Sequence, residues 1–166
     1  CRAKKEKFDK IFGPRVRPRV GLVLEGKPSH VHNHFRSVNA VDFIEVLPSG
    51  ADYFLLQKEL SSQTKTFVSK RSDVKDLSDL LINFSDTAAA CSKMDLIITG
   101  DTAVAHLAGA LGCRTSVLLH YQSDWRWGLE TKTTPWYLNM RLIRLQRDCD
   151  WINVYAEITA NIQSIL

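Results

Sequence analysis

The sequence lacks any apolar run near the roughly 18 residues that a membrane-spanning helix needs. Its basic first residues are not followed by the apolar core of a signal peptide. Glycine and proline are few (8 and 5 residues) and 45% of the residues are hydrophobic, which excludes disordered and collagen-like chains. We therefore expect a cytoplasmic protein whose 166 residues form about one globular domain.

The four cysteines are widely spaced, with no C-x-x-C pair and no histidine at the spacing of a zinc site. We expect reduced thiols, with Cys91 and Cys113 packed in apolar surroundings. The alternation of His30, His32 and His34 would bring three imidazoles to one face of an extended segment. No carboxylate or cysteine completes a metal site there, so neither a metal nor a cofactor is expected.

A G-x-G-x-x-G motif is also missing after the first apolar run, which disfavours a nicotinamide-dependent oxidoreductase. The formal charge of +4 is modest, and most of it lies in the first 19 residues. That segment has one aromatic residue, Phe8, and no platform on which bases could stack, so nucleic-acid binding is not expected. We expect residues 1–18 to form a solvated basic leader helix and linker, ahead of a domain over residues 19–166.

Apolar periodicity and turn residues predict strands that alternate with helices. The expected strands are residues 19–26, 53–57, 66–69, 95–99, 115–119 and 141–145. The expected helices are residues 3–12, 35–47, a short one within 76–84, one that Ser85 or Asp86 caps and that runs to Lys93, 102–111 and 151–166. Strands that are apolar on both faces indicate a Rossmann-like α/β fold, a mainly parallel sheet with helices on both faces.

In such a sheet ligands bind at the carboxyl ends of the strands, which directs attention to residues 26–34, 100–103 and 120–127. The strongest local signal is residues 97–112, IITGDTAVAHLAGALG, where a buried strand turns through glycine into a helix. Free N–H groups in the first turn of that helix would suit an anion, and Thr102 could add a hydroxyl. A plain helix cap by Asp101 is the alternative, and His106 either faces the pocket or packs within the fold.

The same stretch resembles an element of bacterial heptosyltransferase-like glycosyltransferases (family 9), especially the C-terminal domains attached to tetratricopeptide repeats. Several further stretches agree with that family in order and spacing, and they extend the resemblance over residues 14–166. They are residues 20–37 (VGLVLEGKPSHVHNHFRS), 56–58 (LQK), 124–127 (DWRW), 135–137 (PWY), 141–146 (RLIRLQ) and 150–151 (DW). The tryptophans of residues 120–140 could stack on a base or sugar, or pack the loop onto the domain.

The resemblance implies one half of a GT-B fold, the half that holds a nucleotide-diphosphate sugar. Thr102 and Ala103 would contact the diphosphate, Asp101 would lie near the sugar, and Arg36 would stabilise the phosphate charge. The remaining candidates for substrate binding are His106, Lys27, Gln57 and Asp124.

Two features limit that expectation. The first loop departs from the family at Glu25, whose charge would repel a diphosphate unless Lys27 or Arg36 compensates. Only about 18 residues precede the first expected strand, so we expect this sequence not to include the N-terminal acceptor domain, which commonly supplies the catalytic base; no catalytic residue is assigned and the chain is not expected to be active alone. We expect a partner domain or chain, or self-association through the uncovered face. The alternative function is a non-catalytic descendant that acts as a nucleotide-binding or protein-interaction module.

Overall fold

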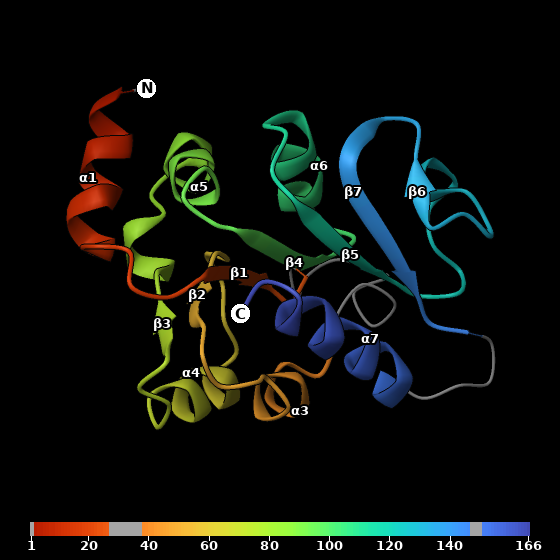
Figure 1. Cartoon of the computed structure of the whole chain (residues 1–166), viewed down its shortest axis with the longest axis horizontal. Helices are drawn as coiled ribbons and strands as arrows, with labels where there is room; N and C mark the ends of the chain where they lie inside the picture. Colours follow the sequence, from red (N-terminus) through yellow and green to blue (C-terminus); the bar gives the residue numbers. More distant parts are fainter. Residues whose placement is uncertain (1, 27–37, 147–150) are drawn as a thin grey trace.

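The computed structural model describes residues 2–26, 38–146 and 151–166, which form one seven-stranded sheet with helices on both faces (Figure 1). The strand order is β3-β2-β1-β4-β5-β7-β6, and every neighbouring pair is parallel except β6 with β7. The strands are β1 (Arg19–Val23), β2 (Asp52–Leu55), β3 (Val74–Asp76), β4 (Leu96–Gly100), β5 (Thr115–Leu119), β6 (Thr133–Thr134) and β7 (Tyr137–Arg144). The predicted Rossmann-like α/β fold is confirmed.

Helices cover the sheet in two layers (Figure 1). One face carries α1 (Arg2–Phe12), α5 (Phe84–Cys91) and α6 (Ala103–Ala110), and the other carries α3 (Ala40–Glu45), α4 (Ser62–Val68) and α7 (Trp151–Gln163). Two short 3-10 helices, η1 (Ser78–Leu80) and η2 (Trp125–Trp127), lie in the connections. The chain order reverses between β1 and β4, so the carboxyl ends of these two strands form the switch point where α/β proteins bind ligands.

Both faces of the sheet bury apolar side chains, as expected for parallel strands. On the α3, α4 and α7 face, Phe43 meets Tyr155 with ring centroids 5.2 Å apart. On the opposite face, Phe12 of α1 meets Phe54 of β2 edge to face at 4.6 Å.

The basic helix α1 is part of this core and is not fully solvated. Phe8 is completely buried and Phe12 is 7% exposed, while Lys4 pairs with Asp86 of α5 at 2.9 Å. The predicted helix is confirmed, but the expectation of a solvated leader is wrong for its apolar face. Helical spacing places Phe8 and Phe12 on one side, and their burial offsets the cost of ordering the segment.

Residues 66–69 are not the third strand that the sequence predicted. Residues 66–68 belong to α4 and Ser69 is its C-cap; the Ser61 side chain accepts from the backbone N–H of Thr64 at 3.2 Å and caps the other end of the helix. Thr64 and Val68 are both buried one turn apart, which is the spacing of a helix packed on a sheet. The third strand is β3, which follows the turn at residues 69–73.

Several further boundaries differ from the prediction. Helix α5 is capped by Asn83, not by Ser85 or Asp86: the Asn83 side chain accepts from Ser85 and Asp86, and Asp86 accepts from the Asn83 N–H in return. Helix 35–47 shortens to α3 among the described residues, and residues 76–84 contain only the single turn η1. The predicted aromatic loop, residues 120–140, contains η2, β6 and the first residues of β7, and β7 pairs with both β5 and β6.

In the described part of the chain no helix has the length and apolar character needed to cross a bilayer.

Candidate functional site

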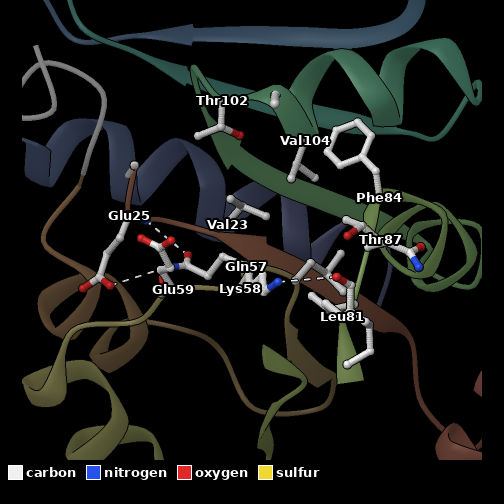
Figure 2. A pocket seen from close by; sticks show the side chains of 15 residues that line it. Val23, Glu25, Gln57, Lys58, Glu59, Leu81, Phe84, Thr87, Thr102 and Val104 are labelled. Atoms are coloured by element: carbon white, nitrogen blue, oxygen red, sulfur yellow. Dashed lines mark hydrogen bonds between the residues drawn. The ribbon is translucent and has the colours of Figure 1, made fainter. Parts of the chain in front are cut away.

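A pocket of about 390 Å³ opens at the switch point, between the ends of β1, β2 and β4 and the starts of α5 and α6 (Figure 2). That volume lies within the range of small-molecule sites. Its lining combines the ends of three strands with the start of two helices: Val23, Glu25, Gly26, Leu56, Gln57, Lys58, Glu59, Leu81, Ile82, Asn83, Phe84, Thr87, Thr102, Ala103 and Val104. We call it the switch-point pocket. The fold therefore places a cavity where the sequence predicted a ligand.

The start of α6 faces this pocket without a side-chain cap. Thr102 is the N-cap residue, in extended conformation, and its side chain makes no capping hydrogen bond. Its hydroxyl instead lies 3.0 Å from the hydroxyl of Thr99 on β4. Helices α3, α4 and α5 are each capped by a side chain. Within the described residues no side chain caps α6, so the N–H groups of Ala103 and Val104 suit a ligand or water.

Gln57 lies in the pocket floor as a clamp between two strands. Its side-chain oxygen accepts from the backbone N–H of Leu24 at 2.8 Å and of Glu25 at 3.2 Å, and its side-chain nitrogen donates to the Glu59 carbonyl at 2.9 Å. Gln57 is 5% exposed. The side chain therefore joins the end of β1 to the end of β2, while its predicted contact with a substrate stays a prediction.

The carboxylate of Glu25 accepts from the side-chain nitrogen of Gln57 at 3.4 Å (Figure 2) and from the start of α4. It accepts from the backbone N–H of Ser61 at 2.9 Å, from the Ser61 hydroxyl at 2.9 Å and from the Thr64 hydroxyl at 2.6 Å. The positive end of the α4 dipole and these three donors stabilise the charge. Glu25 is therefore a structural carboxylate, and the repulsion that it would exert on a diphosphate is reduced by these partners.

The walls of the pocket include residues that the sequence analysis did not single out. Leu81 is buried, whereas Phe84 is 53% exposed and its ring lies near Val104 of α6 (Figure 2). Glu59 is exposed, follows β2 and is one of the polar residues that line the pocket. The general position of ligands at the carboxyl ends of strands could have indicated Glu59. Phe84 was missed because the start of α5 was predicted at Ser85 or Asp86, whereas the helix begins at Phe84.

His106 does not line the switch-point pocket. It lies on the β7 side of α6, in a second pocket of about 450 Å³ lined by His106, Trp125, Arg126, Trp136 and Tyr137, which we call the aromatic pocket. The His106 ring stacks on Trp127 with centroids 5.0 Å apart, and its Nδ1 lies 3.1 Å from the Tyr137 hydroxyl. Asp124 is next to this second pocket, where it accepts from the Arg126 N–H at 3.0 Å and pairs with the Arg126 guanidinium at 2.8 Å.

The structure therefore divides the predicted site residues into groups. Thr102, Ala103 and Gln57 meet in the switch-point pocket, and Asp101 immediately precedes Thr102 at the end of β4. His106 and Asp124 lie toward the aromatic pocket. Lys27, Arg36 and the histidines at 30, 32 and 34 are outside the described residues.

Buried thiols are set apart from both pockets. Cys91 is buried and Cys113 half-buried, and both are free, as predicted. Burial raises the pKa of the Cys91 thiol to about 12, with Cys113 as a smaller cause. Burial likewise raises the pKa of Cys113. Thiols of this kind are not nucleophiles near neutral pH.

Comparison with known proteins gives solved structures of the same fold. The sequence shows no significant similarity to any protein-family model or to any curated protein. ADP-heptose LPS heptosyltransferase II of E. coli aligns with 99% of this chain at 18% identity and a TM-score of 0.61, over 52% of its own length. A glycosyltransferase family 9 protein of Veillonella parvula aligns with 99% at 15% identity and a TM-score of 0.64, over 44% of its length.

The E. coli heptosyltransferase WaaC with ADP-2-deoxy-2-fluoro heptose aligns with 91% of this chain at 15% identity and a TM-score of 0.54, over 43% of its length. This chain thus spans about half the length of these structures. At such low identity the likeness establishes the fold alone. The chain is a Rossmann-like α/β domain with the fold of about one half of a heptosyltransferase-type glycosyltransferase.

Proposed function

We propose that this chain is the donor-binding domain of a GT-B glycosyltransferase and holds a nucleotide-diphosphate sugar at the switch-point pocket. The observation that carries the proposal is the uncapped start of α6, which opens into a pocket between β1 and β4. An anion at that point would satisfy first-turn N–H groups and gain from the helix dipole. The fold it shares with heptosyltransferases supports a nucleotide sugar as the ligand.

The diphosphate and the nucleoside of such a ligand would occupy different parts of the pocket. The diphosphate would accept from the N–H groups of Ala103 and Val104 and from the Thr102 hydroxyl, with the sugar toward Asp101. The nucleoside would lie against the apolar wall at Leu81 and Phe84. Ribose hydroxyls would donate to Glu59, because an acidic residue after the second strand serves that role in dinucleotide-binding sheets.

Charge compensation is assigned to two residues of the first loop. Breaking the sugar–phosphate bond leaves negative charge on the nucleotide, and a cation beside it lowers the barrier. We assign that role to Arg36, as the family resemblance implies, with help from Lys27. Gln57 would act mainly by holding the ends of β1 and β2 in place.

We propose that this chain does not supply all the groups that sugar transfer needs. An inverting transfer needs a base that takes the proton of the acceptor hydroxyl. We propose that this base and much of the acceptor site come from a second domain or partner chain, so the chain alone binds donor but transfers nothing. A non-catalytic nucleotide-binding or interaction module is the second candidate, favoured by the departure of the first loop from the family at Glu25.

The test is calorimetric titration of the chain with UDP, GDP and ADP. One saturable ligand is expected, and Thr102→Val, Arg36→Ala and Glu59→Gln should each weaken it, Arg36→Ala by about tenfold. Glu45→Gln is the matched control for Glu59→Gln, since exposed Glu45 lies on α3 away from the pocket. Binding without any effect of these variants would contradict the assigned site. No binding to any of the three nucleotides would favour the interaction module.

A further inference from the structure

The aromatic pocket is a second concave site, on the opposite flank of α6 from the switch-point pocket. All five lining residues are aromatic rings or arginine: His106, Trp125, Arg126, Trp136 and Tyr137. Trp125 is 74% exposed and Trp136 is 60% exposed. Two solvent-exposed indole rings around one pocket are unusual on a protein surface. Exposed aromatic rings of this kind are typical of binding sites.

The rings of this pocket are fixed in place before any ligand arrives. The Trp136 indole N–H donates to the Arg126 carbonyl at 3.2 Å, which ties the β6–β7 turn to η2. The Arg126 guanidinium lies 5.2 Å from the Trp125 ring centroid and is paired with Asp124. A ligand that binds here would therefore order few side chains, which lowers the entropic cost of association.

Hydrogen-bonding groups sit beside the rings. The Nδ1 of His106 and the Tyr137 hydroxyl lie 3.1 Å apart, and the back of the His106 ring is stacked on buried Trp127. Both groups can donate or accept, according to the His106 tautomer. The pocket thus combines flat apolar surfaces with adaptable polar groups at its inner side.

The charges in the aromatic pocket favour a neutral ligand over one that carries a phosphate. Arg126 is the one cation among the lining residues, and its pairing with Asp124 at 2.8 Å balances it. A phosphate group would gain little from a guanidinium that already holds a carboxylate. A saccharide ring fits the arrangement better, because its C–H face can stack on an indole while its hydroxyl groups donate and accept at the rim.

We propose that the aromatic pocket binds a neutral saccharide, with a sugar ring stacked on Trp125 or Trp136 and its hydroxyl groups bonded to His106 and Tyr137. This binding is separate from nucleotide binding at the switch-point pocket. In a glycosyltransferase the bound saccharide would be the acceptor glycan, and that last step alone rests on the proposed function.

The four tryptophan indole N–H groups report directly on this site in ¹H–¹⁵N spectra. The probes are the methyl glycosides of glucose, galactose, mannose and N-acetylglucosamine, with maltose and cellobiose as disaccharides, each titrated without nucleotide. The Trp125 and Trp136 resonances should shift with saturation for at least one probe, while the Trp151 resonance stays unchanged. Trp125→Ala and Trp136→Ala should each weaken that probe by about tenfold.

Leu138→Ala and Leu129→Ala are the matched controls, because these side chains are 100% and 80% exposed and lie outside the aromatic pocket. Both should leave saccharide binding unchanged, and circular dichroism melts show whether each variant is folded. The proposal is overturned if no saccharide shifts the two indoles, if adenosine or uridine shifts them and no saccharide does, or if Leu138→Ala weakens binding as much as Trp136→Ala. Saccharide binding with no nucleotide binding would contradict the proposed donor site and leave this inference standing.

Discussion

Glu25 accepts a hydrogen bond of 2.6 Å from the hydroxyl of Thr64, so the carboxylate that follows β1 is held at the start of α4. The loop after β1 is the one that approaches a bound phosphate in Rossmann-like folds. A carboxylate in that loop is tolerable for an anion site only if it is turned to other donors. The contacts of Glu25 with Ser61 and Thr64 meet that condition.

Replacing Glu25 by glutamine should have opposite effects on folding and on binding. Glu25→Gln keeps the size of the side chain but loses charge-assisted hydrogen bonds at the α4 terminus, so the free energy of unfolding should fall by about 1–2 kcal/mol. Removal of a negative charge beside the diphosphate should raise nucleotide affinity. Denaturant unfolding and calorimetry measure the two effects. Unchanged stability would show that the Glu25 contacts with α4 contribute little.

Gln57→Leu should destabilise the chain because it leaves buried backbone groups without partners. The substitution removes the acceptor for the N–H groups of Leu24 and Glu25. A loss of about 2–3 kcal/mol in the free energy of unfolding is expected. Gln63→Leu, at an exposed position of α4, is the matched control and should change stability by less than about 0.5 kcal/mol. Equal effects of the two variants would contradict the clamp role of Gln57.

The ion pair of Arg71 and Asp73 makes stability depend on acid pH. The two guanidinium hydrogen bonds, at 2.8 and 2.6 Å, hold the pKa of Asp73 below its ordinary value of 3.8. A carboxyl with a lowered folded-state pKa adds stability that is fully present above the unfolded value. That stability is lost as the pH falls through the folded-state pKa. Unfolding measured from pH 6 to about pH 2 should therefore show a decline that Asp73→Asn diminishes.

Asp79→Asn is the control for that decline, since Asp79 is exposed on η1. It should leave the acid dependence close to that of the unaltered chain. The partly exposed Arg71–Asp73 pair is expected to contribute about 1 kcal/mol at neutral pH. If Asp73→Asn and the unaltered chain lose stability in parallel, the acid dependence has another source.

Gly109 permits the close approach of α6 to β7. A Cβ atom at this position would lie 2.5 Å from Cγ of Tyr137 and 2.6 Å from its Cδ1, atoms near the root of the ring that cannot move without moving the side chain. Gly109→Ala should therefore cost about 1–3 kcal/mol despite the better helix propensity of alanine. It should also displace Tyr137 and with it the aromatic pocket, which the indole resonance of Trp136 would report. A neutral or stabilising effect in thermal melts would contradict this packing.

The parallel sheet was predictable from residues whose pattern is unambiguous. Residues 115–119 are apolar or β-branched except for Ser116, and they form β5 with those same bounds. Gly112 ends α6 with φ of +70°, as a glycine after a helix predicts. The errors lie where a short polar segment has no strong periodicity. Residues 66–69 have strand propensity, yet the cap at Ser61 and the burial of Val68 place residues 66–68 in a helix.

The site was predictable only in part, because side-chain contacts between distant segments decide its form. The position of Thr102 and Ala103 followed from the strand–glycine–helix pattern. The hydrogen bonds of Glu25 to the start of α4 could not be predicted, since Ser61 and Thr64 lie 36 and 39 residues further along the chain. His106 and Val104 line different pockets because residues two positions apart point to nearly opposite sides of α6, and the sequence alone does not show which side meets β7.

The most direct test of the central claim is a titration of ¹⁵N-labelled chain with UDP, GDP and ADP, followed through the backbone amides of Ala103 and Val104. Binding of a diphosphate at the start of α6 predicts that one nucleotide shifts these two amides most strongly, together with residues that line the switch-point pocket such as Glu59 and Phe84. Saturable binding whose largest shifts lie elsewhere in the chain, or no shift with any of the three nucleotides, would contradict the donor-binding account.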